Sequence, residues 1–188
     1  MNKDLNKLAQ QIYEANKAKG FHDEKHSPEH MMCLVISELM EAVEADRKGK
    51  HADLNLFNEH GGKNLADKDY EKAFYYLIKD TVADELADAV IRLLDTAGAL
   101  GVELEKCTDI EQVIEMNSQS LNNKSFTELI FSICGILYSM KMTIATRIRV
   151  TIEAIEAICE VLTIDLWKHV ELKLKYNSLR PYKHGKAY

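Results

Sequence analysis

Helix-breaking residues are scarce in this sequence, which contains two prolines and eight glycines in 188 residues. Long stretches are therefore free of residues that interrupt an α-helix, and this favours an all-α fold. The chain also lacks an apolar run of about 20 residues, the length that spans a bilayer. Its most apolar stretch, 129–140, is shorter and contains Ser132 and Gly135. We therefore expect a core helix there and no membrane segment.

Two further absences concern export and redox chemistry. Residues 1–4 show no apolar region of the kind that signal peptides carry, so we expect a cytoplasmic protein. The four cysteines form no Cys-x-x-Cys pair, and most of them stand in apolar helical contexts. We expect reduced core thiols, neither zinc ligands nor disulfides. These residues are Cys33, Cys107, Cys134 and Cys159.

The composition is that of a globular protein, with 46% hydrophobic and 29% charged residues. We expect one domain over residues 1–188. The net charge of −6 hides an asymmetry, because the tail 168–188 has six basic residues and one acidic residue, whereas the remainder carries −11. An acidic body with a basic tail does not match a nucleic-acid groove. It suits a metal–polyphosphate ligand, which presents both signs of charge.

Apolar residues recur with helical spacing over most of the chain. At the second of these segments, Ser27 is a suitable N-cap and Pro28 fits the first turn. Residues 49–67 lack this periodicity, so we expect a surface excursion, with a lid over a functional site as the alternative. The predicted helices are 4–19, 28–48, 68–100, a short one at 109–116, 126–140, and 144–176 with a break near Thr163.

Two pairs of acidic residues border the apolar faces of two of these helices. Glu38 and Glu41 are three residues apart, as are Glu85 and Asp88, so each pair lies on one helical face. A solvated surface is the commoner explanation of a single such pair. Four carboxylates close to buried surface, however, repel one another, and a hard cation such as Mg²⁺ relieves the repulsion. The sequence therefore predicts a magnesium site between the two helices, and Arg92 stands where it could pair with Asp88.

The segments Ser37-Glu38-Leu39-Met40-Glu41 and Glu85-Leu86-Ala87-Asp88 resemble the EExxE and ExxD motifs of the all-α, MazG-like nucleoside triphosphate pyrophosphohydrolases. The resemblance extends from the first helix to about Gly101 and resumes in the tail, 175–186. The region 104–165 shows no matching motif. Ser37 replaces the first Glu of EExxE, which puts in question the number of metal ions and the activation of water.

The resemblance implies a helical bundle whose metal site lies between two central helices, and hydrolysis of an NTP or dNTP to the monophosphate and pyrophosphate. It implies Mg²⁺, with Mn²⁺ as an alternative, held by the catalytic residues Glu38, Glu41, Glu85 and Asp88, in a homo-oligomer, either a dimer or a tetramer. No nucleic acid or membrane partner is implied. The substrate-binding residues that it implies are Lys175, Asn177, Arg180, His184 and Lys186.

Several points stay open at this level. Glu44 is a candidate general base, and Phe21, Trp167 and Tyr182 are candidate stacking surfaces for a nucleobase. A ferritin-like di-iron bundle is disfavoured because no Glu is followed by a His three residues later. The main alternative is a non-catalytic helical interaction protein whose acidic residues are simply solvated. A nucleic-acid-binding module that uses the basic tail comes third, and the base and sugar of the nucleotide are undetermined.

Overall fold

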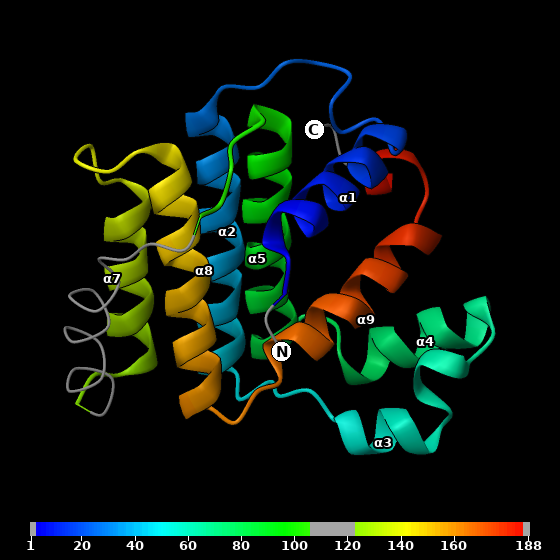
Figure 1. The fold of residues 1–188 in the computed structure, drawn as a ribbon. Helices are drawn as coiled ribbons and strands as arrows, with labels where there is room; N and C mark the ends of the chain where they lie inside the picture. The colour runs from blue at the N-terminus through cyan, green and yellow to red at the C-terminus, as the bar shows by residue number, and fades with distance from the viewer. Residues whose placement is uncertain (1–2, 106–122, 186–188) are drawn as a thin grey trace.

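The computed structural model describes residues 3–105 and 123–185, in which helices are the regular structure and no strand occurs (Figure 1). The all-α class predicted from the sequence is therefore confirmed for this part of the chain. The α-helices are α1 (Leu5–Ala18), α2 (Pro28–Arg47), α3 (Leu54–Glu59), α4 (Asp67–Leu77), α5 (Val82–Leu100), α7 (Phe126–Leu137), α8 (Ile144–Val161) and α9 (Leu166–Leu179). Two short 3₁₀ helices are η1 (Gly62–Asn64) and η2 (Tyr182–Gly185).

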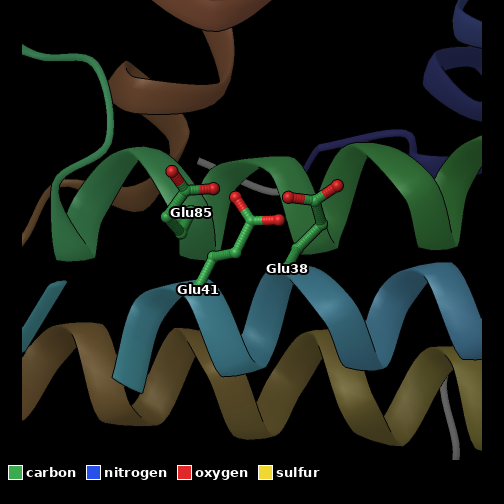
Figure 2. A group of neighbouring side chains, drawn as sticks. All are labelled: Glu38, Glu41 and Glu85. Atoms are coloured by element: carbon green, nitrogen blue, oxygen red, sulfur yellow. The ribbon is translucent and has the colours of Figure 1, made fainter. Parts of the chain in front are cut away.

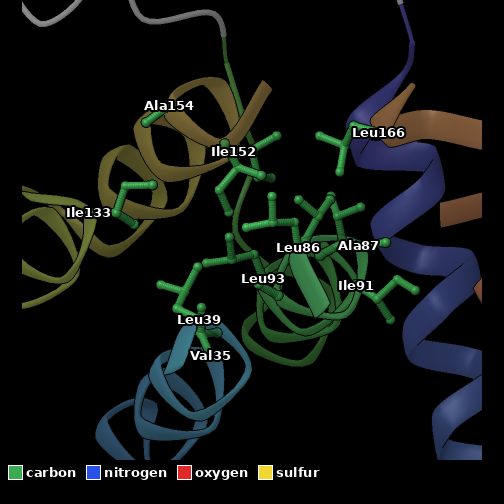
Figure 3. Packing of buried hydrophobic residues seen from close by; sticks show 14 of the residues in the cluster. Val35, Leu39, Leu86, Ala87, Ile91, Leu93, Ile133, Ile152, Ala154 and Leu166 are labelled. Carbon is green, nitrogen blue, oxygen red and sulfur yellow. The ribbon is translucent and has the colours of Figure 1, made fainter. Parts of the chain in front are cut away.

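Helix α5 is the centre of the bundle and packs against α1, α2, α8 and α9. Thirteen of its nineteen residues are buried, as expected for a helix with neighbours on most sides. Helices α2 and α5 run antiparallel, and α7 covers the outer side of α2 and α8 (Figure 1). Figure 3 shows Leu86 and Leu93 of α5 meeting Val35 and Leu39 of α2 in this core.

The crossing of α1 over α5 depends on one glycine. A Cβ atom at Gly98 would lie 2.6 Å from the Cβ of Tyr13 and 2.7 Å from the carbonyl oxygen of Ala9. Both distances are shorter than van der Waals contact, so any side chain at this position would push the two helices apart. This close approach fixes α1 beside the face of α5 that carries Arg92 and Asp95.

Helices α3 and α4 form a small second core with α9, built around Phe57, Phe74 and Leu172. The hydroxyl of Tyr70, also buried there, donates a 2.7 Å hydrogen bond to the carbonyl oxygen of Leu172. The expectation of an irregular segment at 49–67 is therefore wrong in part, because α3 and η1 lie within it. Asp53 caps α3 by accepting a hydrogen bond from the backbone N–H of Leu56 at 2.9 Å.

The single helix predicted over 68–100 is also corrected, because the chain breaks between α4 and α5. Asp80 has a φ of +59°, which a continuous right-handed helix does not allow. Thr81 then starts α5: its Oγ1 accepts from the N–H of Asp84 at 3.3 Å and donates to the carbonyl oxygen of Ile78 at 2.6 Å. A Thr followed three residues later by an acid is a helix-start signal, but the apolar periodicity across the break concealed it.

Other helix boundaries agree with the sequence. Ser27 caps α2 by accepting from the N–H of His30, with Pro28 in the first turn. The break predicted near Thr163 is confirmed, since this residue has a φ of +55° between α8 and α9. Arg180, which precedes a proline, is extended as expected. Helix α7 ends at Leu137, short of the predicted 140, and the helix predicted at 109–116 lies outside the described residues.

The cysteines only partly follow the expectation of core thiols. Cys159 is buried, Cys134 is half-buried and Cys33 is exposed, and all three are free. The expectation is therefore wrong for Cys33, which stands on the outward face of α2, whereas Cys107 lies outside the described residues. None of the described helices is long and apolar enough to cross a membrane.

Candidate metal centre and its flanking cavities

Three of the four predicted carboxylates converge between α2 and α5. Glu38 and Glu41 rise from α2 toward Glu85 on α5 (Figure 2). One carboxylate oxygen from each residue lies within 4.8 Å of the other two. Glu38 and Glu85 are 3% and 4% exposed, whereas Glu41 is exposed, so this glutamate triad opens to solvent on the side of Glu41.

The donor set of the glutamate triad fits a hard divalent cation. All three donors are carboxylate oxygens, which suit Mg²⁺ or Mn²⁺ better than the softer metals that prefer nitrogen or sulfur. Magnesium binds oxygen at about 2.0–2.1 Å, so adjacent ligands in an octahedron are roughly 3 Å apart and opposite ligands roughly 4.2 Å apart. The three carboxylate oxygens lie within 4.8 Å of one another, and side-chain rotations would bring them to the spacing of adjacent ligands. Glu38, Glu41 and Glu85 would hold the ion.

The electrostatics of Glu85 show what a cation would relieve. Burial raises the pKa of Glu85 to about 9, and the neighbouring carboxylates of Asp84, Asp88 and Glu38 add to this rise. Lys173 lowers the pKa of Glu85 in part. Without a metal the Glu85 carboxyl therefore resists ionisation more than an exposed glutamate does. A divalent cation would supply the positive charge that this carboxylate lacks.

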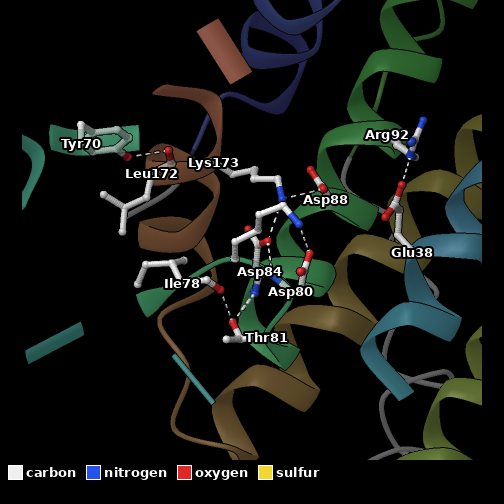
Figure 4. A network of polar contacts seen from close by, with 11 residues as sticks. Glu38, Tyr70, Ile78, Asp80, Thr81, Asp84, Asp88, Arg92, Leu172 and Lys173 are labelled. Atoms are coloured by element: carbon white, nitrogen blue, oxygen red, sulfur yellow. Dashed lines mark hydrogen bonds and ion pairs between the residues drawn. The ribbon is translucent and has the colours of Figure 1, made fainter. Parts of the chain in front are cut away.

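Glu38 has a cationic partner from α5. Arg92 donates from Nε to Oε1 of Glu38 at 2.5 Å (Figure 4). The sequence suggested that Arg92 could pair with Asp88, one turn away on the same helix; the structure pairs it across the helix interface instead. Arg92 thus neutralises one carboxylate of the triad and fixes its orientation.

Asp88, the fourth predicted ligand, stands outside the triad. Its carboxylate is 2.8 Å from Nζ of Lys173, which also donates to Asp84 at 2.7 Å (Figure 4). Burial alone would lower the pKa of Lys173, but Asp88 and Asp84 outweigh it and raise the pKa. Lys173 therefore stays charged and holds Asp88 beside the triad. Sequence reasoning missed Lys173 because its partners lie more than 80 residues away in the chain.

A first cavity, of about 80 Å³, is lined by Arg92, the partner of Glu38, and by Asp88, but by no residue of the triad itself. Rings line it, among them Phe21, His22 and His26. His22 is held in place by Asp95, with 2.9 Å between Nε2 and Oδ1. This cavity therefore offers flat surfaces for stacking beside groups that form hydrogen bonds.

The predicted substrate-binding residues of the tail separate in the structure. Asn177 and Arg180 line the first cavity. Lys175 points elsewhere: its Nζ donates to the carbonyl oxygens of Lys63 and Leu65 at 2.7 and 3.3 Å. His184 lies in η2, and Lys186 lies outside the described residues.

Among the three candidate stacking residues, only Phe21 lines the first cavity. The indole of Trp167 donates to Glu156 at 2.5 Å, and the hydroxyl of Tyr182 contacts Asp23.

A second cavity, of about 300 Å³, adjoins the opposite side of the triad and is lined by Glu41 and Glu85 themselves. Lys48 and Lys50 stand on its wall, at the end of α2 and in the link that follows. The candidate base Glu44 also lies here, and its carboxylate binds Nζ of Lys48 at 2.9 Å. Sequence reasoning missed both lysines, although the Lys48-Gly49-Lys50 segment directly after an acidic helix was a visible signal.

Comparisons of the chain with models of protein families, with curated proteins and with solved structures find no match.

Proposed function

We propose that this protein is a Mg²⁺-dependent, MazG-like nucleotide pyrophosphohydrolase that converts an NTP or dNTP into the monophosphate and pyrophosphate. The observation that carries the proposal is the convergence of Glu38, Glu41 and Glu85 from two antiparallel helices within 4.8 Å of one another. Glu41 and Glu85 line one cavity, and Arg92, the partner of Glu38, lines another of different chemical character. Isolated surface acids need no such cavities beside them.

The chain's own residues bind and orient the substrate in this proposal. The nucleoside reaches into the first cavity from outside, where the ring of Phe21 offers a stacking surface and Asn177 offers hydrogen bonds to the base or sugar. Arg180 and Arg92 line the same cavity and supply positive charge near the first phosphate. The bound metal ion would neutralise phosphate charge and help to deprotonate a water molecule.

Two further residues keep the carboxylates in position. Arg92 holds Glu38 through the 2.5 Å contact from Nε to Oε1, and Lys173 holds Asp88 at 2.8 Å. Such partners reduce the freedom of the carboxylates before substrate binds, which lowers the entropic cost of reaching the reactive geometry. Asp88 is proposed as a ligand or proton acceptor that acts when substrate bridges it to the triad.

The experiment that tests the proposal is an assay of pyrophosphate release from canonical and modified NTPs and dNTPs, with Mg²⁺ and with EDTA. Release that requires the metal and is lost in Glu41→Gln would support it. A folded protein that is silent with every nucleotide, and that shows no binding of Mg²⁺ by calorimetry, would contradict it. The pattern across bases and sugars would also name the substrate.

One observation favours a second candidate, a helical interaction protein. The α7 helix and the turn after it expose Phe131, Tyr138 and Met140, which are 81%, 80% and 86% accessible. Exposed large apolar residues gathered on one element are typical of contact surfaces. Association of the chain that Phe131→Ser abolishes, combined with no release of pyrophosphate from any nucleotide, would favour this candidate. Association together with turnover would instead fit the homo-oligomeric enzyme.

A further inference from the structure

The two cavities beside the glutamate triad differ in chemistry, and they lie at opposite ends of it along the α2–α5 pair. The first is lined by residues from the N-terminal half of α2, such as His30 and Leu34, and by Arg92 and Asp95 of α5. The second is lined by residues near the end of α2 and the start of α5. The two helices run antiparallel (Figure 1), and the triad residues stand between these two groups of lining residues along both helices.

From this arrangement we infer that the second cavity is the pyrophosphate subsite, in which Lys48 and Lys50 bind the two terminal phosphates of the substrate and then the leaving group. The inference rests on the proposed function, and it adds a direction to it: the nucleoside lies at the His22 end of the α2–α5 pair and the terminal phosphates at the Lys50 end.

The charge around the second cavity supports this direction. Glu41 and Glu85 belong to the triad, and the cavity's other carboxylates already have cationic partners. Glu44 pairs with Arg47 and Lys48, and Asp80 pairs with Lys79. Within the described part of the chain, Lys50 takes part in no ion pair. Two lysines and four carboxylates line the cavity. Glu44 and Asp80 are paired, and Glu41 and Glu85 would face the bound metal ion, which leaves the ammonium group of Lys50 to bind a phosphate.

Both lysines line the cavity that Glu41 and Glu85 border. The 2.9 Å contact between Nζ of Lys48 and Oε1 of Glu44 turns the ammonium group back by one helical turn, in the direction of Glu41. The backbone of Lys50 is fixed at both polar groups: its N–H donates to Ala45 at 2.9 Å, and its carbonyl oxygen accepts from Val82 at 3.2 Å. The backbone of the link after α2 is therefore held in place at Lys50, whose side chain would bind a phosphate.

The reverse placement, with the nucleoside in the second cavity and the terminal phosphates in the first, fits the cavities less well. Among the described residues that line the second cavity there is no aromatic ring, and Ala45 is the one apolar member. A nucleobase gains binding energy by stacking and by burial of its faces, which this surface does not provide. The first cavity does provide them, through Phe21 and the rings of His22 and His26.

The reaction balances with this placement. The oxygen of a water molecule forms a bond to the α-phosphorus, and the bond from that phosphorus to the α,β-bridging oxygen breaks. The electron pair stays on the bridging oxygen, which leaves with the pyrophosphate into the second cavity. The proton of the water passes to a carboxylate of the site and then to solvent. No other reactant is required.

The test compares product binding in Lys50→Gln, in the double variant Lys48→Gln/Lys50→Gln and in Lys50→Arg with that of the parent. Calorimetry measures binding of pyrophosphate with Mg²⁺, and inhibition kinetics measure pyrophosphate and the nucleoside monophosphate separately. We expect Lys50→Gln to weaken pyrophosphate binding on the order of tenfold, the double variant to weaken it further, and monophosphate inhibition to stay unchanged. Lys50→Arg keeps the charge and should keep most of the affinity.

Lys68→Gln is the matched control, because Lys68 is an exposed lysine on α4 that lines neither cavity. Equal pyrophosphate affinity in the parent, Lys68→Gln and the double variant would overturn the subsite, as would weaker monophosphate binding with unchanged pyrophosphate binding. A parent that hydrolyses no nucleotide but binds pyrophosphate through Lys50 would overturn the proposed function and support the anion site. Failure of the pyrophosphate subsite can therefore be distinguished from failure of the proposed function.

Discussion

Arg92 on α5 donates from Nε to Oε1 of Glu38 on α2 across a distance of 2.5 Å. The side chain of Glu38 is 4% exposed and that of Arg92 is 28% exposed, so the pair is largely shielded from solvent. Because Glu38 is also a predicted metal ligand, Arg92 and a bound dication would compete for the same carboxylate. In that case the pair would link the stability of the metal-free protein to its affinity for metal.

We predict that Arg92→Met lowers the free energy of unfolding by about 1–3 kcal/mol in EDTA, because Glu38 would be left buried without a counter-ion. Saturating Mg²⁺ should stabilise this variant more than it stabilises the parent. Urea unfolding with EDTA and with Mg²⁺ measures both effects.

Arg149→Met is the control for this comparison, since Arg149 pairs with Glu153 on α8 at 2.5 Å and belongs to neither cavity. Arg149→Met should lower the free energy of unfolding without changing the stabilisation that Mg²⁺ provides. An equal Mg²⁺ gain in Arg92→Met and the parent would show that Glu38 is not a ligand.

Glu41 and Asp88 should differ in how they contribute to metal binding. Glu41 belongs to the triad, whereas Asp88 is held by Lys173 outside it. We predict that Glu41→Gln and Asp88→Asn both reduce turnover by more than about 100-fold, with helical circular dichroism unchanged. Calorimetry of Mg²⁺ without nucleotide should separate them, because only Glu41→Gln removes a ligand of the preformed triad. Loss of helical signal in either variant would mean that the acid is structural.

The sequence predicted the parts of this site that depend on local spacing. Glu38 and Glu41 lie three residues apart at the edge of an apolar stripe, and Glu85 lies in the first turn of a second such helix, so their helical faces followed from periodicity. Ser27 and Thr163 likewise marked real helix boundaries.

What the sequence could not supply depends on how distant elements cross. Lys173 reaches Asp84 and Asp88 only because α9 packs across the start of α5, and no local pattern encodes that crossing. The helix break at Asp80 was missed for another reason. Apolar residues continue on both sides of it, so periodicity outweighed the Thr81 capping signal.

His169 provides a prediction about pH. Burial lowers the pKa of His169 to about 4, whereas an unfolded chain has the ordinary value of about 6.5. Between pH 6.5 and 4 the unfolded chain therefore binds more protons at this residue than the folded one. Stability is fully present above pH 6.5 and falls as the pH drops toward 4, by as much as about 3 kcal/mol from this group.

Urea unfolding of the parent and of His169→Gln between pH 4 and 7 checks this expectation. The variant should lose less stability on acidification, whereas His60→Gln, which alters an exposed histidine, should follow the parent. Parallel pH profiles for the parent and His169→Gln would refute the assignment to His169.

Lys173 carries the largest expected effect on folding. The residue is 4% exposed, and its ammonium group lies between two carboxylates, one of them on the buried Asp84. Lys173→Met would leave both carboxylates without a counter-ion, and breaking a buried pair from one side costs about 3–5 kcal/mol. Adding Asp84→Asn should restore part of this loss, because one fewer charge is then buried.

Lys168→Met, which breaks a solvent-accessible pair with Glu171 on the same helix, should change stability by no more than about 0.5 kcal/mol. If chemical denaturation showed equal losses for Lys173→Met and Lys168→Met, the buried ion cluster would not be what holds α9 against α5.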